Sequence, residues 1–401
     1  MSKSDNILEN FFRSYSDAED MLDYRVANQV IAEKLEVIKT GSAGLDDALS
    51  SGGLPYGRII QFYGKSHSGK TVVSMLCMLE AQKKDPKSKQ IFIDAEGTFS
   101  EIWARALGLD TSRIVVIDGD TAVNGRNLFN MLIGVPKEDA KHILSGKSKL
   151  GLLDHIAAKD PGFEFNMITL DSLGAIIPPI EDVSAVGKSN MSTMARFLSS
   201  AMKKLSLEVK KANIPFVIIN HNRDNMDPYG SDHGYSGGNT YSHFLSANIY
   251  FEAVMRKDSQ ILDDKEQKLG HTIRATVEKS KFGISPRKIE FKIDFTKGYA
   301  DQHLEIANLA LSYDIVQKPT AVSHTYKDKK WVGFNNFAEA LKEDKNLFDE
   351  LSEAVIQARE HKLDKKRTEQ ALKIDTTSDT TDIGNVPEEL IEPKKSKTKE
   401  K

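Results

Sequence analysis

The sequence predicts an α/β protein built around a mainly parallel, twisted β-sheet with helices on its faces. Short apolar runs alternate with amphipathic, helix-like stretches from Thr40 to about Asp294, and this alternation is typical of a parallel sheet. The predicted strands cover residues 59–63, 90–94, 114–117, 166–171 and 214–220, and β-rich runs follow at 247–255, 272–279 and 287–295. Open α/β sheets bind their ligands at the carboxyl ends of the strands, so we expect a site there.

The chain is expected to have four parts. Residues 1–34 form an acidic, helical arm whose apolar side chains need a partner surface, either the chain's own core or a neighbouring subunit. Residues 35–298 hold the α/β core, and residues 299–363 form a small α-rich domain. Residues 364–401 lose their apolar residues and end in a lysine-rich run, which predicts a charged, disordered tail.

The composition narrows the class of protein without assigning a function. The 401 residues carry a formal net charge of −3, so any DNA or RNA contact must be local. Cys77 is the single cysteine, which excludes an internal disulfide and a cysteine-based zinc site and predicts a buried thiol. The N-terminus lacks the order of a signal peptide and no apolar stretch reaches membrane-spanning length. We therefore expect an intracellular protein without a membrane partner.

A phosphate-binding loop follows the first predicted core strand. Residues 64–71 read G-K-S-H-S-G-K-T and lead into a helix-like run. The glycines let backbone N–H groups approach phosphate oxygens, Lys70 reaches the terminal phosphates, and Thr71 offers a hydroxyl to Mg²⁺. The alternative is a glycine-rich turn without a ligand. The predicted nucleotide-binding residues of this loop are Gly64, Lys65, Ser66, His67, Ser68, Gly69, Lys70 and Thr71.

Two carboxylates follow further predicted strands. Glu96 comes after the strand at 90–94, where it would accept a proton from a water that attacks the γ-phosphate, although a Glu in this position is by itself most simply a loop residue. Asp171 ends the strand at 166–171, which is the pattern of an acid that holds the magnesium shell. With Lys70 and Thr71, the two carboxylates complete the set of groups that a nucleoside-triphosphate hydrolase needs.

Several motifs together resemble the RecA family of recombinases. Near the loop they read T-G-S-A-G-L-D-D-A-L from Thr40, G-G-L-P-Y-G-R-I-I-Q-F-Y-G from Gly52, I-D-A-E from Ile93, I-W-A-R from Ile102 and L-D-S-L from Leu170. Further along they read N-M-S-T-M-A-R-F-L-S-S-A-M-K-K-L from Asn190, I-N-H-N-R from Ile219, G-G-N from Gly237 and E-K-S-K from Glu278. The resemblance covers about residues 35–360. It implies a RecA-type ATPase core that uses ATP and Mg²⁺, with Thr71 and Asp171 at the metal, and a small C-terminal domain.

The resemblance also implies roles for two side chains near the nucleotide. Trp103 lies where the family stacks an aromatic ring on adenine; without the family it would be a core residue of an amphipathic helix. His221 lies where the bacterial proteins have a glutamine that senses the γ-phosphate. A histidine there is similar to the UvsX recombinases of T-even-like phages, so the assignment leans toward a phage protein. The alternative for His221 is a strand-terminal histidine bonded to a local carbonyl.

Lys279 and Lys281 stand two residues apart on a predicted strand, so both side chains project from one face. The family uses such a pair to reach the ATP of the neighbouring subunit, where the ammonium groups stabilise transition-state charge. The alternative is a solvated face of an edge strand. With these lysines, the implied catalytic residues are Lys70, Glu96, His221, Lys279 and Lys281.

DNA contact in the family belongs to two loops, which correspond here to about residues 180–190 and 222–236. The implied DNA-binding residues in and beside them are Lys188, Met191, Arg196, Arg223, Gly237, Gly238 and Asn239. Because these segments hold few cations, each protomer neutralises few phosphates, and strong binding requires polymerisation along the strand. Taken without the family, both segments are ordinary surface loops.

The resemblance implies a DNA-dependent ATPase that forms helical filaments on single-stranded DNA and exchanges strands with homologous double-stranded DNA. Its further partners would be a single-strand-binding protein and a loader, in the cytoplasm of a bacterium or of a phage-infected cell. One alternative is a hexameric helicase with the same core fold, which the G-G-N and E-K-S-K motifs oppose. Another is a recombination mediator that binds ATP and DNA without exchanging strands, which the presence of Glu96 opposes.

Overall fold

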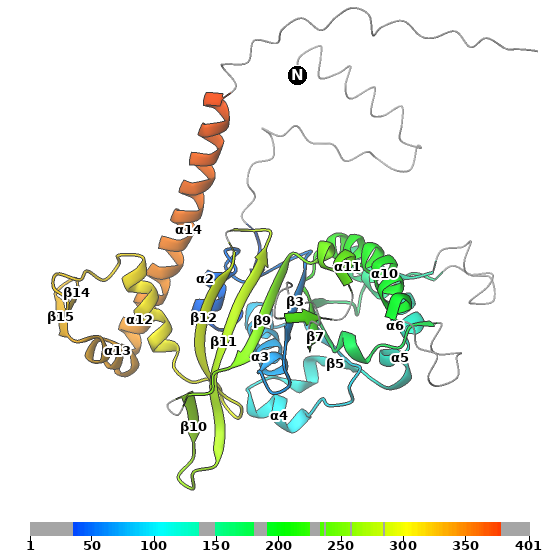
Figure 1. Ribbon diagram of the computed structural model, residues 1–401, viewed down its shortest axis with the longest axis horizontal. Helices are drawn as coiled ribbons and strands as arrows, with labels where there is room; N and C mark the ends of the chain where they lie inside the picture. The colour runs from blue at the N-terminus through cyan, green and yellow to red at the C-terminus, as the bar shows by residue number, and fades with distance from the viewer. Residues whose placement is uncertain are drawn as a thin grey trace, which may run out of the picture. The chain divides into compact units, whose positions relative to one another are not determined.

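The computed structural model describes residues 35–135, 149–179, 191–224, 233–235, 238–256, 259–283 and 285–377 (Figure 1). The chain falls into two compact units, Met1–Val355 and Ile356–Lys401. The predicted arm at residues 1–34 lies outside the described residues. No helix in the described ranges is long and apolar enough to cross a membrane.

One large sheet forms the centre of the first unit, with its strands in the order β13–β12–β11–β9–β3–β7–β6–β4–β5. The strands are β3 (Ile59–Gly64), β4 (Lys89–Asp94), β5 (Ile114–Ile117), β6 (Phe165–Asp171), β7 (Phe216–Asp224), β9 (Ala247–Ala253), β11 (Lys268–Ser280), β12 (Arg287–Asp294) and β13 (Gly298–Tyr299). From β9 to β5 all neighbours pair in parallel, whereas β9, β11, β12 and β13 pair antiparallel. The short strands β10 (Gln260–Leu262) and β8 (His233–Tyr235) pair with β11 and β7.

The predicted α/β fold class is confirmed, and each of the five predicted core strands is present. Among these five strands, β7 shows the largest shift in its start: it begins at Phe216, because the preceding Pro215 has no N–H to give to the ladder. The strand also continues to Asp224 and pairs with β8, so part of the second predicted loop is a β-hairpin stem. The three later β-rich runs are the strands β9, β11 and β12.

Helices cover both faces of the sheet. They are α2 (Ala43–Ala48), α3 (Lys70–Lys84), α4 (Glu101–Ala106), α5 (Gly119–Val123), α6 (Gly125–Ile133), α8 (Leu152–Ala158), α10 (Met191–Ala212) and α11 (Gly238–Phe244), with 3₁₀ turns at Thr111–Arg113 and Leu173–Ala175. Alternate residues of β3 face opposite layers. Phe62 packs with Val73 and Cys77 of α3, whereas Ile59 packs in the core that contains Leu205 of α10. Cys77 is fully buried, as predicted.

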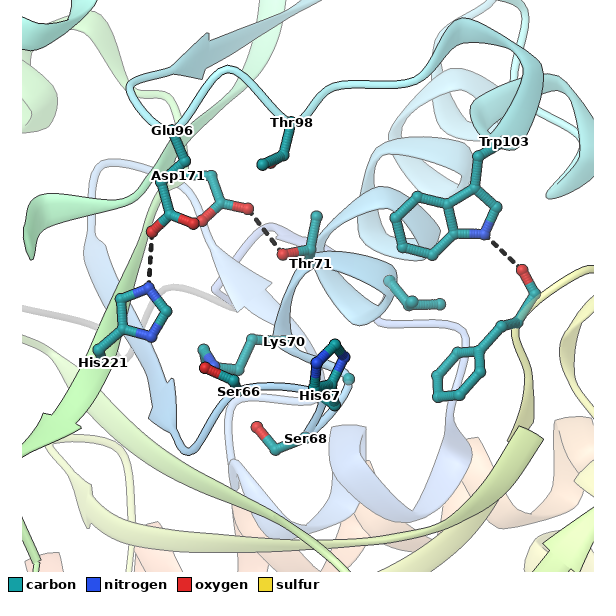
Figure 2. A pocket seen from close by; sticks show the side chains of 13 residues that line it. Ser66, His67, Ser68, Lys70, Thr71, Glu96, Thr98, Trp103, Asp171 and His221 are labelled. Atoms are coloured by element: carbon teal, nitrogen blue, oxygen red, sulfur yellow. Dashed lines mark hydrogen bonds and ion pairs between the residues drawn. The ribbon is translucent and has the colours of Figure 1, made fainter. Parts of the chain in front are cut away.

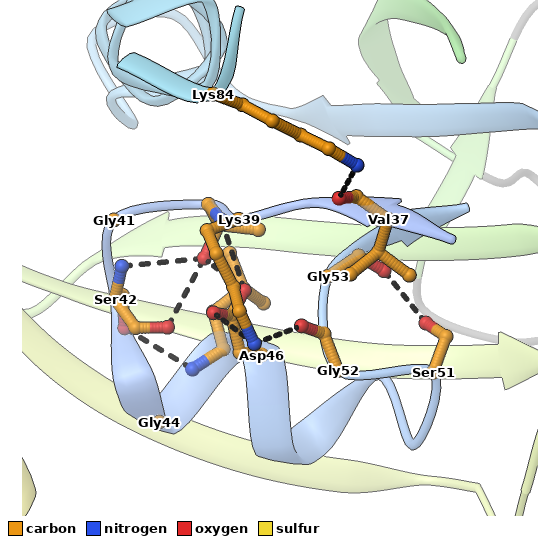
Figure 3. A network of polar contacts seen from close by, with 12 residues as sticks. Val37, Lys39, Gly41, Ser42, Gly44, Asp46, Ser51, Gly52, Gly53 and Lys84 are labelled. Carbon is orange, nitrogen blue, oxygen red and sulfur yellow. Dashed lines mark hydrogen bonds and ion pairs between the residues drawn. The ribbon is translucent and has the colours of Figure 1, made fainter. Parts of the chain in front are cut away.

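A buried polar network fixes the segment that precedes β3 (Figure 3). Asp46 in α2 accepts hydrogen bonds from the backbone N–H and the hydroxyl of Thr40, both at 2.9 Å. Lys39 lies 3.8 Å from the same carboxylate and donates to the Gly52 carbonyl at 2.9 Å. These contacts hold β1 (Val37–Ile38), α2 and β2 (Leu54–Pro55) together just before the chain enters β3.

The small domain packs beside α2. It consists of α12 (Gln302–Ser312), β14 (Ser323–Tyr326), β15 (Lys329–Val332), α13 (Phe334–Glu343) and the first part of α14 (Lys345–Thr377). Glu305 of α12 accepts hydrogen bonds from the Ser42 hydroxyl at 2.6 Å and the Gly44 N–H at 2.9 Å. The β14–β15 hairpin is an addition to the α-rich domain that the sequence predicted.

The last helix continues into the region that the sequence predicted to be a disordered tail from residue 364. Helix α14 extends to Thr377, so residues 364–377 are helical rather than disordered. This stretch is rich in Lys, Arg, Glu, Gln, Leu and Ala, which are strong helix formers. The rest of the predicted tail, residues 378–401, lies outside the described residues.

Candidate nucleotide-binding and catalytic site

The phosphate-binding loop joins β3 to α3, as its sequence predicted. Gly69 has a left-handed backbone with φ of 88°, and a Cβ on it would lie 2.1 Å from Ile273 Cδ1 of β11. A Cβ on Gly64 would lie 2.1 Å from the Phe251 carbonyl oxygen of β9. Only glycine therefore lets the loop lie this close to the neighbouring strands.

A pocket of about 500 Å³ opens above this loop, within the size range of small-molecule sites (Figure 2). The residues that line it come from the loop, from the ends of several strands and from α4. They are Ser66, His67, Ser68, Gly69, Lys70, Thr71, Val72, Glu96, Thr98, Trp103, Asp171, His221 and Phe295. The fold thus brings Lys70, Thr71, Glu96, Trp103, Asp171 and His221, which the sequence singled out, to one cavity.

Lys70 is held against its own loop. Its ammonium donates to the carbonyls of Gly64 at 3.1 Å and Lys65 at 2.8 Å. Burial lowers its pKa, and the charges of Asp171 and Glu96 act in the opposite direction. The buried Ser68 hydroxyl has no hydrogen-bond partner among the described residues. A buried hydroxyl without a partner at a phosphate-binding loop is a group that a phosphate oxygen would satisfy.

Thr71 and Asp171 meet on one side of the loop. The Thr71 hydroxyl donates to Asp171 Oδ2 at 2.6 Å. Burial raises the pKa of Asp171 to about 6, against the opposing effect of the Thr71 hydrogen bond. A divalent cation would favour the charged carboxylate, because its charge replaces the lost solvation. A hydroxyl beside a carboxylate fits the oxygen ligands that Mg²⁺ prefers.

Glu96 and His221 form a direct pair across the pocket (Figure 2). Glu96 Oε1 lies 2.6 Å from His221 Nε2 and also accepts a hydrogen bond from the Ser172 hydroxyl. The hydrogen bond from His221 is the largest cause that lowers the pKa of Glu96, and Ser172 adds to it against the effect of burial. His221, expected to face the γ-phosphate, therefore contacts the predicted base in this structure. The contact with Glu96 accounts for the position of the His221 ring without the hydrogen bond to a local carbonyl that was the alternative.

Trp103 lines the far end of the pocket, where its indole N–H donates to the Phe295 carbonyl (Figure 2). Phe295 and Thr98 are lining residues that no sequence motif indicated. Asp94 accepts the N–H groups of Thr98 at 3.0 Å and Phe99 at 2.8 Å, which fixes the turn that carries Thr98. Phe295 follows β12, and only the pairing of distant strands brings it to the pocket.

Lys279 and Lys281 do not line this pocket. Their ammonium groups donate to consecutive carbonyls at the end of α11, Lys279 to Ser242 at 2.6 Å and Lys281 to His243 at 3.0 Å. The two side chains thus point the same way, as their spacing predicted. Burial is the main cause that lowers the pKa of each lysine.

The predicted DNA-binding residues are only partly described. Lys188 and Gly237 lie outside the described residues. Met191 and Arg196 belong to α10, Arg223 lies near the end of β7, and Gly238 and Asn239 begin α11. Arg196 is the one of the seven whose side chain the structure describes, and it does not line the nucleotide pocket.

The comparisons with known proteins agree on one family. A family model described as the RecA N-terminal domain matches residues 19–145 and 145–300. The chain is similar to Protein RecA of Helicobacter pylori (strain G27), with 33% identity over 323 residues that cover 80% of this chain and 83% of that protein. Protein RecA of Helicobacter hepaticus is 32% identical over 326 residues, which cover 80% of this chain and 84% of that protein. Protein RecA of Dichelobacter nodosus is 31% identical over 307 residues, which cover 76% of this chain and 77% of that protein.

These bacterial relatives do not test the lean toward phage UvsX proteins, which stays a prediction. The family match covers the nucleotide pocket and most of the core, and the relatives extend it into the small domain. The chain therefore belongs to the RecA family of ATP-hydrolysing DNA recombinases, as its motifs indicated.

Proposed function

We propose that the chain polymerises on single-stranded DNA as a helical filament and uses ATP and Mg²⁺ to catalyse homologous pairing and strand exchange. The observation that carries the proposal is the single pocket in which the phosphate-binding loop, Asp171 and the Glu96–His221 pair meet. The same strand, β7, that brings His221 to this pocket leads into the second predicted DNA loop. Membership of the RecA family supports the same function.

In this proposal Lys70 and the backbone of residues 64–69 hold the triphosphate, and Trp103 stacks on the adenine. Thr71 and Asp171 would hold Mg²⁺, which when bound supplies positive charge to the phosphate oxygens. The unsatisfied Ser68 hydroxyl and the Thr71–Asp171 oxygen pair fit these two ligands. The remaining lining residues shape the site around them.

Glu96 is the proposed general base. Both of its hydrogen bonds, from His221 and Ser172, go to Oε1, which leaves Oε2 to take a proton from an attacking water. Ser172 holds the carboxylate in place from the end of β6. We propose that His221 leaves Glu96 when it turns to the γ-phosphate, so the base gains freedom only when the nucleotide is bound.

The remaining residues act between subunits and on DNA. Lys279 and Lys281 would exchange their α11 carbonyls for the phosphates of a neighbouring protomer's ATP. Lys188, Met191, Arg196, Arg223, Gly237, Gly238 and Asn239 would contact the DNA. A single-strand-binding protein and a loader are predicted partners of the filament.

Electron microscopy of the protein with single-stranded DNA and a non-hydrolysable ATP analogue tests the assembly. We expect continuous helical filaments whose length follows the length of the DNA. Closed rings would favour the helicase alternative. Filaments that fail to pair homologous DNA would favour the mediator alternative.

A further inference from the structure

Gln61 is a fully buried amide in the middle of the central strand β3. Its chain neighbours Ile60 and Phe62 face the apolar core beside α3, whereas Gln61 faces the layer of α10 and α11. A buried amide left without partners destabilises the fold, because the hydrogen bonds that it made to water are not replaced. The position of Gln61 therefore requires polar groups on the neighbouring elements.

Three buried side chains satisfy Gln61. Its Oε1 accepts hydrogen bonds from the Tyr241 hydroxyl at 2.7 Å and from Asn220 Nδ2 at 3.2 Å, and its Nε2 donates to Asn248 Oδ1 at 2.8 Å. The exposed fractions of Gln61, Asn220 and Tyr241 are all 0%, and that of Asn248 is 5%. Strand β3 lies between β7 and β9 (Figure 1). Gln61 is directly opposite Asn248 of β9, whereas Asn220 of β7 is opposite Tyr63, two residues further along β3.

The partners of Oε1 lie on the two stems of the second predicted DNA loop. Asn220 is on β7, which enters the loop, and Tyr241 is on α11, which follows it. The Asn220 side chain also accepts the backbone N–H of His221 at 2.9 Å, and the His221 ring reaches Glu96 at 2.6 Å. A continuous chain of hydrogen bonds thus runs from α11 through Gln61 to the predicted base.

A second branch leads toward the lysine pair. Asn248 Nδ2 donates to Glu278 at 3.3 Å, and Glu278 precedes Lys279 in β11. Lys279 in turn binds the carbonyl of Ser242, the residue after Tyr241. The amide of Gln61 therefore connects the elements that carry the proposed DNA contacts, the γ-phosphate contact and the contact to the neighbouring subunit.

We propose that Gln61 is a positioning residue that couples DNA contact at the second loop to ATP hydrolysis. One amide oxygen holds both stems of the loop, so neither α11 nor β7 shifts without breaking or redirecting a hydrogen bond in a dry environment. That cost makes the stems move together and carries their movement to His221. The inference rests on the proposed function and adds a residue that the motifs did not assign.

Tyr241→Phe tests the coupling, because it removes one hydrogen bond to Gln61 and keeps the aromatic ring. We expect the ATPase rate without DNA, the KM for ATP and the melting temperature to stay near wild type. The stimulation of kcat by single-stranded DNA should fall at least about fivefold, the lower end of typical coupling between sites. Tyr299→Phe is the matched control, since it removes a hydroxyl that donates to Thr40 at 3.1 Å in a different network. Its stimulation by DNA should equal that of the wild type.

Gln61→Met removes all three hydrogen bonds and keeps the volume, and it should lose the stimulation more completely. Its melting temperature is measured first; if it does not fold, Tyr241→Phe decides alone. DNA stimulation within twofold of wild type in Tyr241→Phe would overturn the proposal. So would an equal loss of the rates with and without DNA, because Gln61 would then only support the site. A wild-type ATPase that ignores DNA would instead refute the proposed function, before any variant is compared.

Discussion

Glu96 shows how much the site depends on single contacts. His221 and Ser172 both donate to its Oε1, and these bonds hold the carboxylate in its charged form by lowering its pKa. The motif I-D-A-E predicted Glu96, and the end of the β6 strand predicted Asp171. The sequence did not predict Phe295 or Thr98 in the pocket, because strand pairing and a turn held by Asp94 bring them there.

Glu96→Gln should separate ATP binding from hydrolysis. The amide keeps the shape and an oxygen for the Ser172 and His221 donors, but it cannot take a proton from water. We expect nucleotide affinity within a few-fold of wild type and hydrolysis lower by about a hundredfold or more, measured by fluorescent-nucleotide binding and phosphate release. Hydrolysis at the wild-type rate would move the base to another residue.

Lys70→Ala should abolish hydrolysis, since it removes the charge that meets the terminal phosphates. Loss of such a contact costs about 3 kcal/mol or more in the transition state, which is roughly a hundredfold in rate. Lys83→Ala is the matched control, because Lys83 lies at the other end of α3 and pairs on the surface with Glu80 at 2.6 Å. Near-normal turnover in Lys70→Ala would refute the assignment of the loop.

The core strands were easier to predict than the exact ends of the elements or the short β14–β15 hairpin. The core strands follow apolar runs bounded by polar residues, and β5 (Ile114–Ile117) has the predicted bounds. The β14–β15 hairpin was missed because its residues, S-H-T-Y and K-K-W-V, mix polar and aromatic types without an apolar run. The hairpin is held instead by its backbone pairing and by the aromatic contact of Trp331 with Phe337, whose ring centroids are 5.0 Å apart.

The contact between α12 and α2 predicts a pH dependence of stability. Burial raises the pKa of Glu305 to about 7. The folded chain thus binds this proton more tightly than the unfolded chain, and stability falls as pH rises from about 4.5 to about 7. Glu305→Gln keeps an acceptor for Ser42 and Gly44 without the charge. Between pH 5 and pH 8 the free energy of unfolding of wild type should therefore fall relative to that of Glu305→Gln, by at most about 3 kcal/mol.

Chemical denaturation across this pH range measures the difference. Glu343→Gln is the control, because it removes the same charge from an exposed position of α13. A difference between Glu305→Gln and wild type that does not change with pH would show that the carboxyl does not titrate in this window.

At the scale of the whole molecule, the site of one chain is incomplete in the proposed mechanism. Lys279 and Lys281 lie away from the chain's own pocket and bind the end of α11. Only the family resemblance assigned a role to these lysines, because spacing shows which way side chains point and not which subunit they reach. The same limit applies to Lys188 and Gly237, which lie outside the described residues.

Replacing both lysines by alanine should leave ATP binding intact and remove hydrolysis, because γ-phosphate charge at the subunit boundary is no longer neutralised. Mixing this variant with Lys70→Ala creates some junctions that pair a normal loop with normal lysines. We expect the mixture to regain ATPase activity that neither variant has alone. Demonstrated co-assembly without recovery would place the lysines' action within their own subunit.

We expect this chain to exchange DNA strands at the expense of ATP. The most direct measurement is strand exchange between circular single-stranded DNA and a linear duplex, with ATP, Mg²⁺ and Lys70→Ala as the inactive control. We predict joint molecules and exchanged duplex only when the two DNAs are homologous and only with the wild-type protein. Separation of heterologous duplexes at the same rate, or no exchange by a protein that hydrolyses ATP on DNA, would contradict the account.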